Sequence, residues 1–171
     1  MTAPAASALS LPAGARTVAY LGPAATFNQQ ALLSQPDLAA LEATPLPTIS
    51  DVLTATATDE VDLGFVPIEN AIEGSVTVTL DMLAFELDLL VQREVVIDVS
   101  LNLLGVPGAR LEDLREVSSI NVATAQCRRF LTENLPGAVT TAANSTAEAA
   151  QRVAKEGDRT VAAIGTALAA E

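Results

Sequence analysis

Histidine is absent from this 171-residue sequence, and Cys127 is its single cysteine. An internal disulfide bond therefore cannot form, and a metalloenzyme is not expected because zinc, haem and Ser-His-Asp chemistries lose their usual ligand or base. Basic residues are also scarce, with nine Lys and Arg against twenty-one Asp and Glu and a net charge of −12. A surface of this sign repels phosphate backbones and anionic lipids, so nucleic acid is not expected as a partner.

Long uninterrupted apolar runs are missing as well. No window approaches the roughly 18 apolar residues that a membrane span needs, so no membrane contact is expected. The leader MTAPAASALSLPAGA has no basic start and no sustained apolar run. Residues 1–16 are therefore predicted to be a flexible N-terminal tail rather than a signal peptide, and the protein is predicted to be cytoplasmic.

Half of the residues are apolar, which is enough for a buried core in one domain or two small lobes. In the first half, apolar runs alternate with helical patterns. Strands are expected at 17–21, 43–46 and 61–66, and helices at 25–35 and at 48–57, where Thr48 is the N-cap. Strands that are apolar on both faces and joined through helices predict a parallel sheet covered on both sides.

The second half repeats this alternation. After a turn leading into a helix, the segment 87–106 is extended and too long for one compact strand, and it is interpreted as the crossover between two lobes. The lobes are predicted at 17–98 and 99–171. The second lobe is expected to contain strands at 114–120, 138–143 and 159–165, helices at 122–135 and 145–157, and the start of another helix at its end.

Two helices of the second lobe carry further signals. The helix at 122–135 is expected to place one apolar stripe against the core, made of Ala123, Cys127, Phe130, Leu131 and Leu135. The helix at 145–157 begins with Ser145 and has Glu148 three residues later, which is the pattern of a capping box.

Two short α/β lobes joined by a crossover are expected to form a cleft, and ligands of open α/β sheets gather at the carboxyl ends of the strands. Four loops are informative, namely 22–28, 67–75, 119–126 and 143–146. Taken alone, Thr26 and Ser145 are better explained as helix caps than as ligands. The loop at 67–75 is a stronger signal because it brings several polar groups together, namely Glu69, Asn70, Glu73 and Ser75. An ordinary acidic surface turn explains this loop equally well.

Four motifs together resemble the catalytic region of the prephenate dehydratase family. They are YLGPAATF, VPIENAIEGSVTVTLDML, AQCRRFL and NSTAEAA, in this order, and the resemblance covers roughly residues 17–171. It implies an α/β fold of the two-lobed periplasmic-binding-protein-like (type II) kind, with a cleft between the lobes. It also implies conversion of prephenate to phenylpyruvate, water and carbon dioxide in phenylalanine synthesis, with no cofactor, by a homodimer or a homotetramer.

The resemblance implies specific site residues. Glu69 and Asn70 match the Ile-Glu-Asn core of the middle motif and are the candidate catalytic residues. We expect Glu69 either to orient a hydroxyl donor or to donate a proton itself. The candidate substrate-binding residues are Thr26, Ser75, Ser119, Gln126, Ser145 and Thr146. Because cations are scarce in these loops, we expect the starts of the helices to face the substrate carboxylates.

Several positions depart from the family pattern. Ala25 stands where the family prefers glycine, Asn28 where it has Ser or Thr, Ala71 where it has Ser, and residues 120–121 where it has His-Pro. The Thr-Arg-Phe motif, whose threonine is the favoured catalytic hydroxyl of the family, occurs nowhere in these residues. The chain is therefore expected to be truncated before that motif and a C-terminal ACT domain, and to be weakly active by itself.

Two other readings stay open. A prephenate decarboxylase of secondary metabolism would leave the ring hydroxyl on its product. The protein hydroxyl groups that this chain lacks relative to the family pattern would suit such an activity. A non-catalytic module that binds a small anion would show affinity for the ligand without turnover.

Overall fold

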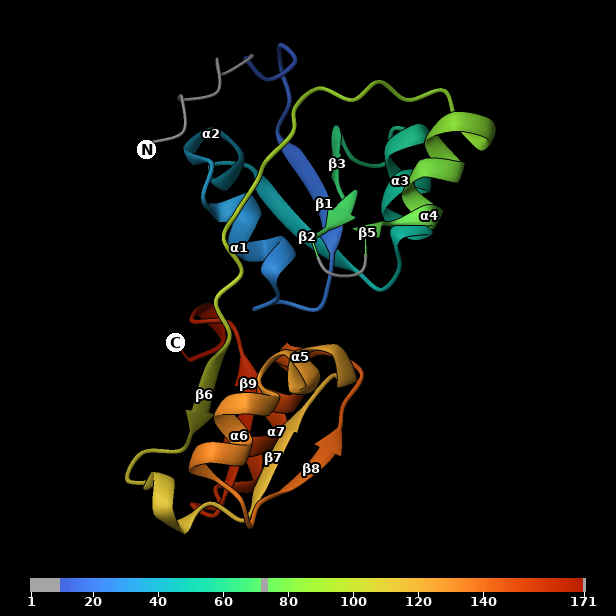
Figure 1. Cartoon of the computed structure of the whole chain (residues 1–171). Coiled ribbons are helices and arrows are strands. Elements are labelled where there is room, and N and C mark those ends of the chain that lie inside the picture. Colours follow the sequence, from blue (N-terminus) through green and yellow to red (C-terminus); the bar gives the residue numbers. More distant parts are fainter. Residues whose placement is uncertain (1–9, 72–73, 171) are drawn as a thin grey trace, which may run out of the picture. The chain divides into compact units, whose positions relative to one another are not determined.

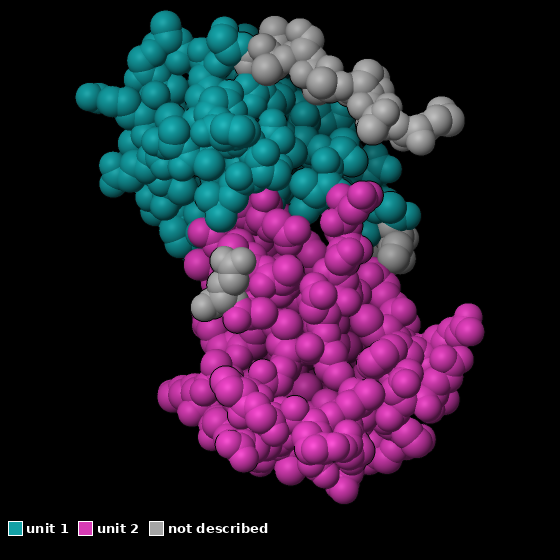
Figure 2. All heavy atoms as spheres, turned by 90° about the vertical axis from the view of Figure 1, so that its left-hand side faces the viewer, with its two compact units in different colours: residues 1–22, 31–97 teal, residues 23–30, 98–171 magenta. Residues whose placement is uncertain are grey.

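The computed structural model describes residues 10–71 and 74–170. The chain divides into two compact units, which Figure 2 colours separately: residues 1–22 with 31–97 (unit 1) and residues 23–30 with 98–171 (unit 2). The segment 23–30 thus groups with unit 2, although the sequence places it in the first lobe. Within unit 2, the Thr166 hydroxyl donates a hydrogen bond to the Ala25 carbonyl of this segment at 2.9 Å. Of the expected tail, residues 1–9 lie outside the described residues.

Unit 1 holds most of the expected first alternation. In chain order its elements are β1 (Thr17–Leu21), α1 (Phe27–Leu33, whose first residues belong to unit 2), α2 (Pro36–Ala39), β2 (Glu42–Leu46), α3 (Ile49–Ala57), β3 (Leu63–Phe65), β4 (Glu69–Asn70), β5 (Gly74–Ser75), α4 (Thr77–Asp81) and a π-helical turn at Met82–Glu86. The predicted N-cap of α3 is confirmed, since the Thr48 hydroxyl accepts a hydrogen bond from the Asp51 amide at 3.0 Å.

The main sheet of unit 1 has the order β2-β1-β3 with both pairings parallel, as predicted. Helices α1 and α2 lie over one face of this sheet and α3 and α4 over the other (Figure 1). On the first face, Val18 and Tyr20 of β1 pack with Leu32 and Leu38. The prediction of strands buried on both faces holds for β1 but is wrong for β2, which is an edge strand with four of its five residues exposed.

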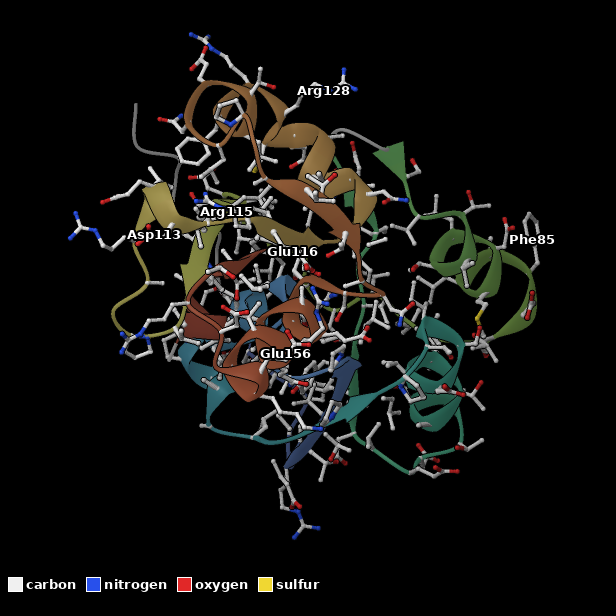
Figure 3. The ribbon with its side chains drawn as sticks, turned by 90° about the horizontal axis from the view of Figure 1, so that it is seen from below. Phe85, Asp113, Arg115, Glu116, Arg128 and Glu156 are labelled. Atoms are coloured by element: carbon white, nitrogen blue, oxygen red, sulfur yellow. The ribbon has the colours of Figure 1, made fainter. Side chains whose placement is uncertain are left out.

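The segment 87–101 is extended, as expected for a crossover. Arg93 attaches it to α2 through two parallel hydrogen bonds to the Asp37 carboxylate, Nη1 to Oδ1 at 2.9 Å and Nη2 to Oδ2 at 2.6 Å. This hydrogen bonding lowers the pKa of Asp37. Just before the segment, Phe85 points away from the ribbon (Figure 3) and is 84% exposed.

Unit 2 contains the second alternation. Its elements are β6 (Asn102–Gly105), a 3-10 turn (Leu111–Asp113), β7 (Glu116–Ser119), α5 (Asn121–Gln126), α6 (Arg128–Asn134), β8 (Val139–Ala142), α7 (Thr146–Glu156), β9 (Val161–Gly165) and a 3-10 turn (Leu168–Ala170). The sheet order is β6-β9-β7-β8, with β6 antiparallel to β9 and the other pairs parallel.

Each face of this sheet has its own core. On one face, Val117 and Ile164 pack with Leu131 and Leu135, and Figure 1 shows α5 and α6 on this side. On the other face, Ala163 packs with Val153 of α7 and its neighbours. The alternation of side chains along β7 and β9 therefore divides the residues between two helix layers.

The single helix expected at 122–135 is wrong, because the chain forms two helices that break at Cys127 (φ −88°, ψ 1°). Ala123, Leu131 and Leu135 are buried as predicted, and Cys127 is half-buried. Phe130, however, is 44% exposed. The predicted stripe is therefore confirmed after the break at Leu131 and Leu135 and is wrong at Phe130.

Within the described ranges, none of the helices has both the length and the apolar content that crossing a bilayer requires.

Candidate active site

The hairpin at residues 67–76 positions the candidate catalytic residues in unit 1. Its two short strands are antiparallel, and Glu69 pairs in register with Ser75 and Asn70 with Gly74. The Val76 amide donates to the Ile68 carbonyl at 2.9 Å and extends the ladder. Residues directly opposite in such a pair have Cβ atoms roughly 4.5–5.5 Å apart. Glu69 and Ser75 are therefore brought together, whereas Glu73 lies outside the described residues.

A buried threonine anchors this hairpin. Thr79 of α4 is fully buried, and its hydroxyl donates to the carbonyl of Pro67 at 2.7 Å. Glu69, Asn70 and Ser75 themselves are exposed. The hairpin is thus fixed at its base while its three candidate residues face solvent.

In unit 2, candidate residues follow neighbouring parallel strands. Ser119 ends β7, and Ser145 and Thr146 follow β8. The Ala143 amide donates to the Ser119 carbonyl at 2.9 Å and joins the two strand exits. Because the carboxyl ends of parallel strands meet at one edge of a sheet, the structure gathers these hydroxyl residues at the same edge.

The individual roles of these hydroxyls differ. Ser119 is fully buried, and its hydroxyl donates a hydrogen bond to the Ile164 carbonyl at 2.8 Å, so it joins β7 to β9. Ser145 caps α7 by accepting from the Glu148 amide at 2.9 Å. The capping box is confirmed only in this half, since the Glu148 carboxylate accepts from the Asn144 amide at 3.0 Å instead of the Ser145 amide.

Thr26 lies in the segment 23–30, just before α1, and is 8% exposed. Its carbonyl accepts from the Gln30 amide at 3.0 Å. The residue before it, Ala25, has a φ of +64°, in the left-handed region. A non-glycine residue there carries a strain of roughly 1–2 kcal/mol. Glycine, which the resemblance implies at this position, adopts this region without such strain.

The remaining candidate, Gln126, is exposed at the last residue of α5. It lies more than one turn beyond Asn121, where α5 begins at the strand edge. The helix lengths also limit the expected helix-dipole contribution, since α1, α4 and α5 have seven, five and six residues and α7 has eleven. A macrodipole requires a longer helix, so α7 suits this role best.

A hollow of about 450 Å³ opens elsewhere on unit 2, between α5, α6 and β8. Asn121, Thr124, Arg128 and Thr140 contribute its polar groups, and Arg128 extends away from the ribbon in Figure 3. The predicted site residues do not line this hollow. Among the described residues, no group of three or more His, Cys, Asp or Glu could hold a metal ion.

Two threonines that are not among the sequence-predicted site residues donate hydrogen bonds to the candidate loops. Thr79 anchors the hairpin, and Thr166, which directly follows β9, donates to the Ala25 carbonyl. A signal for Thr166 exists in the sequence, since it is a hydroxyl residue that follows its strand, as Ser145 does. Thr79 has no such signal, because it sits inside a short helix.

Ionised carboxylates in the scaffold are stabilised by hydrogen bonds. In unit 2, the Arg152 guanidinium and then the Thr141 hydroxyl lower the pKa of Glu116, which Figure 3 labels. In unit 1, the Arg16 amide and then the Thr17 hydroxyl lower the pKa of Asp62. Burial raises the pKa of the Cys127 thiol, so this cysteine is not an activated nucleophile.

A family model described as prephenate dehydratase matches residues 18–171. This chain belongs to the prephenate dehydratase family. A prephenate dehydratase from Mycolicibacterium gilvum (strain PYR-GCK) is 40% identical over 164 residues, which cover 90% of this chain and 52% of the relative. The chain thus spans about half the length of the curated relatives it matches.

Solved structures agree with this membership. The prephenate dehydratase of Arthrobacter aurescens, in complex with L-Phe, superposes with a TM-score of 0.82 and is 35% identical, covering 90% of this chain and 50% of its own. The predicted type II periplasmic-binding-protein-like fold class is thereby confirmed. A quorum quenching acylase has a TM-score of 0.75 and 28% identity, covering 91% of this chain and 55% of its own. The same fold therefore occurs in a protein described by another activity.

Proposed function

We propose that this chain acts as a prephenate dehydratase, which converts prephenate to phenylpyruvate, water and carbon dioxide in phenylalanine biosynthesis. The family match over residues 18–171 carries this proposal, supported by 40% identity to a curated prephenate dehydratase. The activity and the substrate are proposed, since the chain spans about half of such relatives. The cytoplasmic location and the homodimer or homotetramer stay predictions from the sequence.

The chemistry of prephenate sets the requirements. The substrate carries two carboxylates and a ring hydroxyl, and the gain of aromaticity drives the loss of carbon dioxide and hydroxide. The protein must therefore hold a dianion and supply a proton to the departing hydroxide. General acid catalysis of this kind is worth typically ~10²–10⁴-fold in rate.

The hairpin of unit 1 is proposed to supply the proton. Glu69 and Ser75 are cross-strand partners, so the carboxylate is well placed to orient the Ser75 hydroxyl toward the leaving group. Asn70, the next residue of the same strand, is proposed to hold Glu69 in this arrangement. In the second version of the hypothesis, Glu69 itself donates the proton.

The hydroxyls of unit 2 are proposed to bind the carboxylates. Ser145 and Thr146 lie at the start of α7, the longest of the helices concerned, and Thr26 lies at the start of α1. The Ser119 hydroxyl already donates a hydrogen bond to the Ile164 carbonyl, so Ser119 is proposed to contribute by holding the strand edge in register. Gln126 keeps its proposed binding role from the family resemblance alone.

Turnover and binding of prephenate by the full chain test this proposal. We expect prephenate to bind in calorimetry and to be converted slowly to phenylpyruvate, which absorbs as an aromatic enol in base. In the Glu69→Gln variant kcat should fall at least ~100-fold because the orienting carboxylate is lost. Glu42, exposed at the start of β2, provides a matched control, and Glu42→Gln should leave kcat unchanged.

Each alternative outcome has its own meaning. Normal turnover by Glu69→Gln would remove Glu69 from the chemistry. A dihydro product that keeps its hydroxyl would identify a prephenate decarboxylase, and binding without turnover would identify a non-catalytic module. If the wild-type chain does not bind prephenate but hydrolyses an acyl amide, its activity would resemble that of the quorum quenching acylase instead.

A further inference from the structure

Ala25 is held in the left-handed region by groups outside its own peptide. Two described non-glycine residues have a positive φ, Ala25 at +64° and Asp59 at +57°. Aspartate tolerates this region because its short polar side chain can bond locally, but alanine has no such means. The conformation of Ala25 therefore has to come from its surroundings.

Both polar groups of Ala25 are engaged by side chains. Its amide donates to the Gln29 side-chain oxygen at 2.6 Å, and its carbonyl accepts from the Thr166 hydroxyl at 2.9 Å. A rotation of Ala25 into the right-handed region would redirect both groups and break both bonds. The two side chains thus select the left-handed conformation.

The Thr166 hydroxyl takes part in two hydrogen bonds. Thr166 is fully buried, and its oxygen accepts a hydrogen bond from the Ala169 amide at 3.0 Å. A hydroxyl has one proton and two lone pairs, so the Thr166 oxygen can donate to the Ala25 carbonyl while it accepts from the Ala169 amide. The Thr166 hydroxyl therefore links the 3-10 turn after β9 to a residue 141 positions away in the sequence.

We propose that Thr166 is a positioning residue for Thr26, with Gln29 as its partner in the same clamp. By fixing Ala25 in the left-handed region, the clamp sets the direction in which the chain enters Thr26 and α1. The importance for ligand binding rests on the proposed function, in which Thr26 contacts a substrate carboxylate. The positioning itself is independent of the identity of that substrate.

Amide hydrogen exchange measured by NMR on the full chain tests the clamp without any ligand. In Thr166→Val, which keeps the shape and loses the hydroxyl, the amides of Ala25 and Gln30 should exchange about tenfold faster, as the loss of one buried hydrogen bond implies. Thr166→Ser should stay near the wild-type rate. Gln29→Met removes the side-chain oxygen that accepts from the Ala25 amide and should produce the same change. This variant provides the test if Thr166→Val does not fold.

Prephenate binding by calorimetry provides the second readout. In Thr166→Val the affinity should fall about tenfold, and adding Ala25→Gly should restore it to within about threefold of wild type, because glycine adopts a positive φ without help. If Thr166 only filled space or only held the Ala169 amide, glycine at position 25 would restore nothing. The matched control is Thr124→Val, which removes a hydroxyl bonded to the Ile120 carbonyl at the start of α5 and should leave both readouts unchanged.

The outcomes separate this inference from the proposed function. Unchanged exchange at Ala25 and Gln30 in Thr166→Val would overturn the clamp, as would an affinity loss that Ala25→Gly fails to reverse. A wild-type chain without affinity for prephenate would overturn the proposed function alone. In that case the exchange rates still decide whether Thr166 positions Thr26.

Discussion

The hairpin at residues 67–76 in unit 1 and the segment 23–30 in unit 2 each contain a residue with a positive φ. In the hairpin it is Gly74 (φ +83°), and in the segment it is Ala25 (φ +64°). Each of the two loops also accepts a hydrogen bond from a fully buried threonine. Thr79 donates to the Pro67 carbonyl, and Thr166 donates to the Ala25 carbonyl. Both candidate loops are thus tied to their own unit by one side-chain hydroxyl.

The difference lies in where the hydroxyl acts. In the hairpin it bonds to Pro67, seven positions before the left-handed residue, and glycine adopts its conformation without strain. In the segment it bonds to the strained residue itself, and Gln29 bonds to the same residue. The conformation of Gly74 is therefore encoded locally, whereas the conformation of Ala25 depends on a tertiary contact.

The largest expected effect comes from the hairpin anchor. Thr79→Val should lower the free energy of unfolding by about 1–3 kcal/mol, because the Pro67 carbonyl would be left without its donor. Thr79→Ser, which keeps the hydroxyl, should lose less. Urea denaturation of both variants measures the difference. Equal stability of the valine and serine variants would mean that the hydroxyl does not anchor the hairpin.

Substitutions at the two residues with a positive φ test the comparison further, with smaller expected changes in stability. Gly74→Ala should destabilise the protein by about 1 kcal/mol through backbone strain alone, since no atom lies within 4 Å of the added Cβ. Ala25→Gly should stabilise by up to about 1 kcal/mol, because the relieved strain exceeds the gain in unfolded-chain entropy.

Gly137 provides the control for this pair, since it also has open space around the added Cβ but no positive φ. Gly137→Ala should be neutral or slightly stabilising in the same denaturation experiment. A Gly74→Ala variant as stable as Gly137→Ala would show that the hairpin turn does not require its left-handed residue.

The smallest effect concerns the ion pair of unit 2. Because the pKa of Glu116 is lowered by Arg152, its contribution to stability is fully present above about pH 5 and is lost as the pH falls through the lowered value. The pair is partly exposed, with 30% of the Glu116 side chain and 39% of the Arg152 side chain accessible, so this contribution is at most about 1 kcal/mol.

Denaturation at several pH values checks this sign. The stability gap between wild type and Glu116→Gln should be largest near pH 7 and should close as the pH falls below the usual pKa of a glutamate and through the lowered value. A gap for Glu116→Gln that stays constant with pH would remove the ion pair as its cause. Asp62 of unit 1, whose pKa is also lowered, should behave in the same direction.

Much of the fold could be predicted because local patterns suffice for it. The apolar run of β1 and the Thr48 cap of α3 are short-range signals, and the structure contains both. The break at Cys127 could not be predicted, because no glycine or proline marks it and the helical pattern continues through it. The exposure of β2, by contrast, has a signal in the sequence, since Pro45 lies within this strand and proline is confined to edge strands and bulges.

The candidate site divides in the same way. The Ser145 cap follows from its capping-box pattern, whereas the sequence predicts only a loop at residues 67–75 and not the hairpin that pairs Glu69 with Ser75. The complete burial of Ser119 and its bond to Ile164 depend on a strand 45 residues away. No spacing rule connects residues at such separations.

By itself, the sequence determined which side chains this protein has available: acidic and hydroxyl groups in four loops, without histidine and with one cysteine. It also determined the alternation of strands and helices, since the periodicity of apolar residues is a local property. Only the tertiary structure decided that Ala25 adopts a conformation that alanine normally avoids. The reason is physical, because its two restraining bonds come from Gln29 and from Thr166, and the second forms only after the chain has folded.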